Sequence, residues 1–342
     1  MTADNEYSPV LKAYPSNCQP QTIAFLDSAG GFSGARLWRL ETPRGPACLR
    51  RWPLEQQVER LEFIQAVLWH VDQEGFRLVS VPWETFERAG YVRHGGFLWE
   101  LGPWLPGSAD YEQQPSQARL EAALVALARF HRAAESFPLP ESGMTTSPGI
   151  SERRSRLAEL MSGGFERLSA AVHSKQSGDR GAGGWPELDL RARELLQFFP
   201  RAAHRVGPIL ESAANMRARL QPCIRDIWHD HVLFVGSEVS GLVDFGAMRP
   251  ESVAADVARL LGSLAGDDLE AWETGLDAYQ HIAPLTDVEL KLITAFDRSN
   301  ALMAGLQWLE WIYVEGRSFA NRTGVLKRVD ANLYRLANLA EA

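Results

Sequence analysis

The sequence predicts an α+β fold in which a β-rich N-terminal part precedes a larger, mainly helical part. Short runs of β-branched and aromatic residues, separated by turn residues, fill the first 105 residues around a single helical stripe. Long amphipathic stretches follow, and a strand hairpin within residues 223–246 interrupts them. Because glycine and proline end the strand pattern at Gly102–Gly107, we expect one lobe at 1–105 and a second at 106–342.

The N-terminal elements follow from alternation and turn signals. Gln56–Gln73 carries apolar residues at 61, 64, 68 and 71, which is the spacing of one helix face. Gly95-Gly96 marks a hairpin turn. Strands are expected at 22–26, 35–40, 47–52, 79–86, 91–93 and 97–101.

The second lobe is expected to be helical around its hairpin. Ser116 is placed to cap a helix at 117–135, and Ser151 to cap one that runs to Leu160. The Ser/Gly-rich stretch 174–185 predicts a loop. Further helices are expected at 188–199, 202–220, 252–265, 268–281, 287–315 and 324–340.

Composition narrows the class of protein. Hydrophobic residues make up 45% and charged residues 23% of the 342 residues, a typical profile for a soluble globular protein. The net charge of −8 argues against a nucleic-acid partner, and no apolar run approaches the ~20 residues that span a bilayer. Three scattered cysteines and the absence of a secretory signal predict a cytoplasmic protein without disulfides.

Two aspartates and a histidine gather around the hairpin. Asp226 lies in a polar loop, His231 follows five residues later at the start of an apolar strand, and the second strand ends in Asp244-Phe245-Gly246. Phosphoryl transfer requires a group that orients the acceptor hydroxyl, ligands for a divalent metal and positive groups for the phosphates. Asp226 suits the first role, and Asp244 suits the second because Mg²⁺ prefers oxygen ligands.

These residues make the chain resemble the aminoglycoside phosphotransferase and choline kinase-like family, a relative of the protein kinases. The spacing from 226 to 231 to 244 is that of the family's catalytic Asp, metal-binding Asn and metal-binding Asp, and Asp256-Val257-Ala258 is similar to its Asp-x-Ala segment. The resemblance implies a bilobal, protein kinase-like fold with a small β-rich N-terminal lobe and a larger helical C-terminal lobe. It also implies that Asp256 braces the catalytic loop.

The chain departs from the family pattern in its metal site. His231 stands where the family has Asn, and Ile224 stands where it has the loop His. An imidazole nitrogen suits Mn²⁺ or Zn²⁺ better than Mg²⁺, so the cofactor is expected to be Mg²⁺ or Mn²⁺, with Asp230 as an alternative ligand. If His231 ligates, Mn²⁺ is expected to support turnover at least as well as Mg²⁺, with activity fading below roughly pH 6.5.

The resemblance places the nucleotide in the N-terminal lobe. The glycine-rich loop that contains Gly30, Gly31, Ser33 and Gly34 stands between two strands, where its amides could cover the phosphates of ATP. Arg50 occupies the place of the family's clamp Lys, and Arg51 is expected to face solvent. Glu59 or Glu62 of the following helix is expected to be the acid that orients the clamp. The backbone at Glu100 and Leu101 is expected to pair with the adenine of ATP.

The acceptor pocket is weakly marked. Trp308, Glu310 and Trp311 share a helix face that suits a cationic or sugar-like alcohol, although a buried packing stripe fits the same pattern better.

The leading hypothesis is an ATP-dependent phosphotransferase that transfers the γ-phosphate to a hydroxyl group of a small molecule. A nucleotide-binding pseudokinase is the alternative, because the loop His, the clamp Lys and the metal Asn are all replaced. A zinc hydrolase built on His229-Asp230-His231 is a third reading, although this spacing is unlike that of common zinc clusters.

Overall fold

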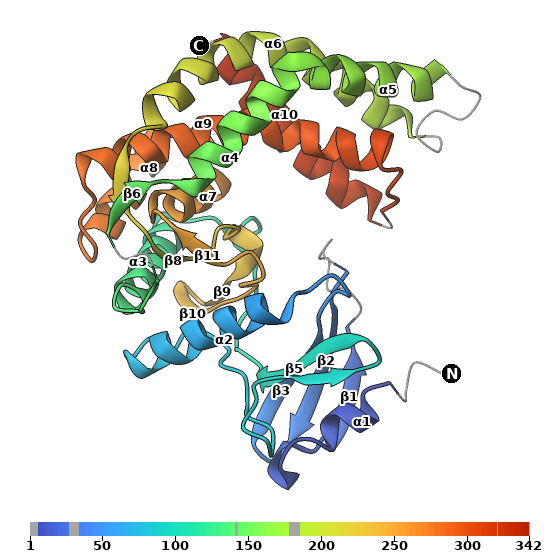
Figure 1. The fold of residues 1–342 in the computed structure, drawn as a ribbon, viewed down its shortest axis with the longest axis vertical. Coiled ribbons are helices and arrows are strands. Elements are labelled where there is room, and N and C mark those ends of the chain that lie inside the picture. The colour runs from blue at the N-terminus through green and yellow to red at the C-terminus, as the bar shows by residue number, and fades with distance from the viewer. Residues whose placement is uncertain (1–5, 27–33, 141–142, 178–184, 320, 342) are drawn as a thin grey trace. The chain divides into compact units, whose positions relative to one another are not determined.

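The computed structural model describes residues 6–26, 34–140, 143–177, 185–319 and 321–341 (Figure 1). The chain divides into two compact units. Within the described ranges, no helix is both long and apolar enough to cross a bilayer.

The first unit contains the chain up to Pro138 together with Asp226–Arg249 and Thr274–Ala283. Its main feature is a five-stranded antiparallel sheet in the order β1-β2-β3-β5-β4 (Figure 1). In this register Arg50 of β3 lies directly opposite Glu100 of β5. The strands are β1 Thr22–Phe25, β2 Arg36–Thr42, β3 Gly45–Arg51, β4 Val92–His94 and β5 Phe97–Pro103.

An aromatic core holds this sheet together. Trp38 and Trp99 pack with ring centroids 5.3 Å apart, and Val10 of the short helix α1 (Ser8–Leu11) is buried in the same cluster. A turn of 3-10 helix at Ser16–Cys18 follows α1. Helix α2 (Val58–Gln73) buries its predicted stripe, including Leu61 and Ile64. Each burial of a large apolar side chain stabilises the unit by about 1.5–3 kcal/mol.

The prediction of a strand at 79–86 is wrong. In this segment Val79 makes an isolated bridge with Leu242, while the amide of Trp83 donates to the carbonyl of Leu101 and that of Phe86 to the carbonyl of Ala13. Pro82 removes a ladder donor from the run, which disfavours a continuous strand.

A β-hairpin completes the first unit, together with helix α3 (Gln117–Ala134), which Ser116 caps as predicted. Strands β9 (Val232–Val235) and β10 (Glu238–Leu242) form the hairpin. Main-chain bonds fix it at two points: the amides of Ser108 and Phe234 each donate to the other's carbonyl, and the amide of Leu242 donates to Leu78. The hairpin therefore carries the segments on either side of it into fixed positions in this unit.

The second unit contains Leu139–Arg225, Pro250–Glu273 and the chain from Pro284 onward. Helix α6 packs against α9 and α10, and α7 also packs against α9. Two small sheets pair β6 with β7 and β8 with β11. Helix α8 (Leu269–Gln280) runs from this unit into the first. The remaining elements are α4 Pro148–Glu159, α5 Phe165–Ser177, α6 Pro186–Ala213, α7 Ala254–Leu264, α9 Asp287–Leu309, α10 Arg322–Glu341, β6 Met144–Thr146, β7 Arg217–Arg219, β8 Gln221–Cys223, β11 Arg249–Glu251 and the π-helical turn Glu310–Val314. Between α4 and α5 the chain kinks at Leu160–Gly164, where Gly163 has a φ of +104°.

Two helical predictions need correction. Helix α4 is capped by Ser147, which accepts the amide of Ile150, and not by Ser151. Residues 188–199 and 202–220 do not form two helices: α6 continues through Pro200 because its apolar stripe does, with Phe199 and Val206 buried on either side. The α+β class, with an antiparallel sheet in the N-terminal part and mainly helices after it, is confirmed, while the lobe boundary at residue 105 stays a prediction.

Candidate active site

The backbone at Asp244 has an unusual conformation directly after β10. Asp244 has a φ of +62° and Arg225, the residue before Asp226, has a φ of +68°. Asp tolerates this left-handed region better than most residues, whereas Arg does so at a cost. Strain of this kind clusters at functional sites.

His231 connects the two aspartates of the first unit. It ends the 3-10 turn His229–His231, and its Nδ1 lies 2.8 Å from the carbonyl oxygen of Asp226. Its Nε2 accepts the indole N–H of Trp228 at 2.9 Å and lies 3.7 Å from the Oδ2 of Asp244. Because an indole can only donate, the imidazole proton belongs on Nδ1, where it is donated to Asp226.

Arg50 forms the cationic side of this site. Its guanidinium donates to the Oδ1 of Asp244 at 2.9 Å and lies over the ring of Trp52, 3.7 Å from the centroid. Partial burial favours the neutral carboxyl of Asp244, but the charge and the hydrogen bond of Arg50 outweigh this effect and lower its pKa. Asp244 is therefore an ionised carboxylate at neutral pH, and its side chain is 39% exposed.

This donor chemistry fits a divalent cation. An ionised, half-exposed carboxylate is a suitable Mg²⁺ ligand, so Asp244 could hold the metal. For His231 to ligate, its Nε2 would have to release the N–H of Trp228. Since both ring nitrogens of His231 already have protein partners, the geometry does not favour the zinc reading.

Glu100 on β5 lies directly opposite Arg50 on the neighbouring strand β3. Its carboxylate accepts the side-chain amide of Gln65 from α2 at 2.9 Å, and Gln65 also donates to the carbonyl of Gly90 at 3.0 Å. Burial raises the pKa of Glu100, and the charge of Arg50 opposes this shift. Glu59 is exposed, and Glu62 instead accepts the hydroxyl of Tyr91 at 2.8 Å.

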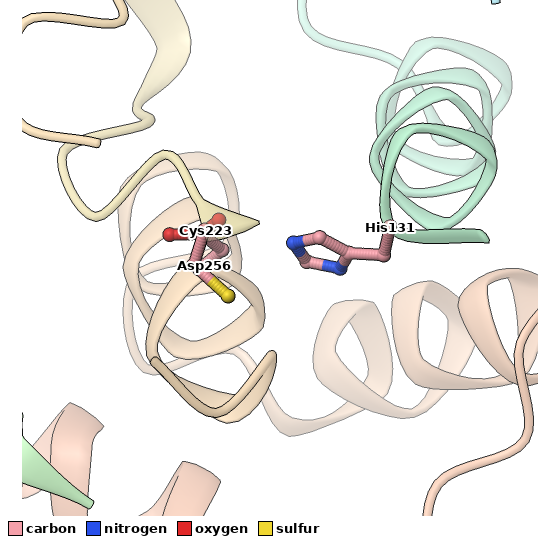
Figure 2. A group of neighbouring side chains, drawn as sticks. All are labelled: His131, Cys223 and Asp256. Atoms are coloured by element: carbon pink, nitrogen blue, oxygen red, sulfur yellow. The ribbon is translucent and has the colours of Figure 1, made fainter. Parts of the chain in front are cut away.

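The second unit holds the loop that leads to Asp226. Asp256 of α7 accepts the amide of Ile224 at 2.6 Å and that of Arg225 at 2.5 Å, which confirms its expected bracing role. Figure 2 shows Asp256 of α7 beside Cys223 of β8. Burial raises the pKa of the Cys223 thiol, whose Sγ donates to the carbonyl of Glu251, so this thiol is a packed structural group.

The structure places the other predicted nucleotide residues as follows. Gly30, Gly31 and Ser33 lie outside the described residues, while Gly34 has a φ of +77° just before β2. Leu101 lies within β5, where its carbonyl accepts the amide of Trp83. Their contacts with a nucleotide therefore stay predictions.

Arg51 and the late tryptophans have protein partners. Arg51 does not face solvent as expected: its side chain is 11% exposed, donates to Glu6 at 2.7 Å and lies over the ring of Phe97. Trp308 is buried and packs edge-on against Trp311 at 5.1 Å. The packing interpretation of this pair therefore describes Trp308 well.

Two residues of the site were missed at the level of sequence. Gln65 is 1% exposed and is the polar member of an inward helix face that also carries Leu61 and Leu68. A lone amide on an apolar stripe is a detectable signal, because buried polar groups need partners. Trp52 carried no comparable signal, since stacking depends on the path of the chain after β3.

Known proteins resemble this chain over most of its length. Residues 28–290 match the family model described as "Phosphotransferase enzyme family". The homoserine kinase of Bradyrhizobium sp. (strain ORS 278) is 22% identical over 320 residues, which is 91% of this chain and 87% of that protein. That of Rhizobium rhizogenes (strain K84 / ATCC BAA-868) is 31% identical, but over 93 residues, 25% of this chain and 29% of its own length.

Among solved structures, a spectinomycin phosphotransferase in complex with ADP and spectinomycin shares the fold. Its TM-score is 0.65 at 10% identity, with 94% of each chain covered. The match to the family model over residues 28–290 shows that the chain belongs to the phosphotransferase enzyme family.

Proposed function

We propose that this protein is an ATP-dependent kinase that phosphorylates a hydroxyl group of a small molecule. The observation that carries the proposal is the continuous set of contacts from Arg50 through Asp244 and His231 to Asp226. It groups a phosphate-binding cation, a metal-binding carboxylate and a candidate base within one compact unit.

Each residue has a distinct role in the proposed reaction. Asp226, which is exposed, accepts the proton of the acceptor hydroxyl or orients that hydroxyl toward the γ-phosphate. His231 holds the backbone of Asp226 through its carbonyl. Arg50 binds phosphate oxygens, and the amides of the glycine-rich loop at 30–34 cover the phosphates from the N-terminal side.

Asp244 is the proposed ligand of Mg²⁺, or of Mn²⁺ if His231 also ligates. A divalent cation bound here would neutralise charge that develops on the phosphates. The His231→Asn variant tests the participation of the imidazole. A fall in the ratio of Mn²⁺-supported to Mg²⁺-supported turnover is expected if His231 ligates, and an unchanged ratio rejects ligation.

For the acceptor, we propose a small amino-acid-like alcohol, with homoserine as the first compound to test. Support comes from the homoserine kinases that align with 91% of this chain at 22% identity. A panel that also contains choline, an aminoglycoside and spectinomycin separates this acceptor from other alcohols.

The direct test is phosphate transfer from labelled ATP to this panel. Asp226→Ala is expected to lower kcat by about 10²–10⁴-fold, because a positioned base contributes that much. Asp244→Ala is expected to lower it by at least about 10²-fold. The exposed Glu87→Gln serves as the control for loss of an acidic group in the same unit. Full activity in either aspartate variant overturns the assignment.

A nucleotide-binding pseudokinase is the second candidate. Two contacts favour it: Arg50 pairs with the proposed metal ligand Asp244, and Trp228 occupies the Nε2 of His231. Calorimetry with ATP and Mg²⁺ or Mn²⁺ distinguishes the two functions. Binding without transfer to any acceptor of the panel supports the pseudokinase, and measurable transfer removes it.

A further inference from the structure

The charge of Arg50 has two acidic neighbours. Asp244 contacts the guanidinium directly at 2.9 Å, while Glu100 lies opposite Arg50 in the register of β3 and β5. Residues directly opposite each other in an antiparallel pair project from the same face of the sheet. Glu100 and Arg50 therefore share one face of the sheet.

These two acids have different tasks in a kinase. If Asp244 binds a cation with the nucleotide, its oxygens become shared with that cation. Arg50 then needs a second negative group that stays in place while the guanidinium turns to the phosphates. Glu100 is fixed on β5, which pairs with a strand on each side, and its carboxylate accepts the side-chain amide of Gln65 at 2.9 Å.

Helix α2 does not supply this acid. Glu59 is exposed and Glu62 binds the hydroxyl of Tyr91, so neither is engaged with Arg50. The buried residue of α2 next to Glu100 is the neutral Gln65, whose amide nitrogen donates to both Glu100 and the carbonyl of Gly90. The helix therefore contributes a hydrogen-bond donor, and the sheet contributes the charge.

Keeping a carboxylate in this place is costly. Glu100 is half-buried, and an acid that loses part of its hydration stabilises a fold little unless its partners compensate for that loss. An apolar residue or an amide at position 100 would avoid that cost. The carboxylate of Glu100 therefore indicates a function. It can act through Arg50, the neighbouring cation on β3.

We propose that Glu100 is the positioning residue of Arg50, acting from the sheet in place of a helix acid, with Gln65 holding its carboxylate. This inference rests on the proposed function, since it assigns Arg50 to the phosphates of ATP. Glu100 itself touches neither the nucleotide nor the acceptor through its side chain.

The test measures binding of ADP with Mg²⁺ by calorimetry in the full-length chain, so that no acceptor is needed. Glu100→Gln keeps the size of the side chain and can still accept from Gln65, but it removes the charge. We expect its Kd for ADP to rise about tenfold, while its midpoint of thermal unfolding is unchanged or higher. A purely structural residue would show the reverse pattern: a lower midpoint and an unchanged Kd.

Two further variants sharpen the comparison. Glu62→Gln removes the rival acid of α2 and is expected to leave the Kd unchanged. The double variant Gln65→Glu/Glu100→Gln moves the carboxylate from β5 to α2 and is expected to recover at least part of the lost affinity. If this double variant fails to fold, Glu100→Asp replaces it, since a shorter acid should retain more affinity than the amide.

The outcomes separate this inference from the proposed function. A wild-type protein that binds no ADP rejects the proposed function itself. A wild-type protein that binds ADP, together with a Glu100→Gln variant of equal affinity or a Glu62→Gln variant of reduced affinity, overturns the inference about Glu100 alone. If an acceptor is known by then, KM for ATP should rise in Glu100→Gln more than kcat falls.

Discussion

Asp244 shows how a single residue can serve a site at a local cost. Its φ of +62° turns the chain directly after β10, and its carboxylate then meets both Arg50 and His231. The following Gly246 leaves room for this contact, because a Cβ there would lie 3.3 Å from the Oδ1 of Asp244 and 3.4 Å from the ring of Trp52. The Asp-x-Gly pattern therefore has a steric reason in this chain.

The charge of Asp244 predicts a pH-dependent stability. Its pKa is lowered in the folded protein, so the pair with Arg50 stabilises the fold fully above the unfolded-state pKa of about 3.9. This contribution is lost as the pH falls through the lower, folded-state pKa. Urea unfolding of the wild type and Asp244→Asn should show a constant difference between pH 5 and 7 that shrinks below about pH 4. A difference that grows on acidification contradicts this prediction.

The chemistry of the site could be predicted from single residues, but its cross-strand contacts could not. Asp226, His231 and Asp244 are close in sequence and carry a recognisable spacing. Glu100 and Gln65 are brought together by the register of β3 with β5 and by the packing of α2. Such pairings depend on tertiary structure, and no local pattern encodes them.

At the level of elements, α7 controls the loop before Asp226. Its Asp256 is fully buried and accepts two successive amides of that loop, which are those of Ile224 and Arg225. These two bonds hold Arg225 in its left-handed conformation. The Asp256 carboxylate therefore fixes the direction of the backbone from Arg225 to Asp226.

Asp256→Asn is expected to lower kcat by about 10²-fold, because its amide group presents a donor to a backbone donor and displaces the loop. Nucleotide affinity should change little, since Arg50 and Asp244 belong to the other unit. Single-turnover kinetics and ADP calorimetry measure the two effects separately. An unchanged kcat in a folded variant would show that the loop does not depend on Asp256.

Glu251 performs a comparable task at the start of α4. This fully buried carboxylate accepts the hydroxyl of Ser147 at 2.6 Å and the amides of Gly149 at 2.7 Å and Ser252 at 2.9 Å. This contact requires glycine at position 149, because a Cβ there would lie 2.6 Å from the Oε2 of Glu251.

Removing this carboxylate leaves buried donors without an acceptor. Glu251→Ala is therefore expected to lower the free energy of unfolding by about 3 kcal/mol in urea titrations. Ser155→Ala, at an exposed position of the same helix, should stay within about 0.5 kcal/mol of the wild type. Equal stability of both variants would contradict a capping role for Glu251.

The prediction of helices and strands succeeded where the apolar residues had a regular spacing, and it failed in two segments that contain proline. Helix α3 was predicted with its cap, and it is a strongly amphipathic stretch behind Ser116. The segment at 79–86 has strand-like residues, yet Pro82 and its bonds to other segments keep it irregular. In α6, by contrast, the buried stripe on both sides of Pro200 outweighs the lost hydrogen bond.

For the whole molecule, the proposed function predicts linkage between nucleotide binding and stability. A ligand at 100 times its Kd stabilises the folded state by about 2.7 kcal/mol. ADP with Mg²⁺ should therefore raise the midpoint of thermal unfolding by several degrees, and less in Asp244→Asn and Glu100→Gln. Differential scanning calorimetry checks this, and an unchanged midpoint in the wild type at millimolar ADP counts against nucleotide binding.

The net charge of −8 affects how the whole protein attracts or repels a charged ligand. A nucleotide is itself anionic, so its approach depends on local cations such as Arg50 and on the divalent metal that accompanies it. The same net charge argues against broad nucleic-acid binding, but composition could not identify the acceptor, because the choice among hydroxyl compounds depends on a few specific contacts.

The hairpin that ends at Asp244 is fastened to its unit by main-chain groups of Leu78, Ser108, Phe234 and Leu242. Every residue type except proline has a backbone N–H, so most substitutions at these anchors leave the main-chain bonds in place. Evolutionary drift in this region can then proceed far while the carboxylate keeps its place, and the fold can be shared at 10% identity with a distant phosphotransferase.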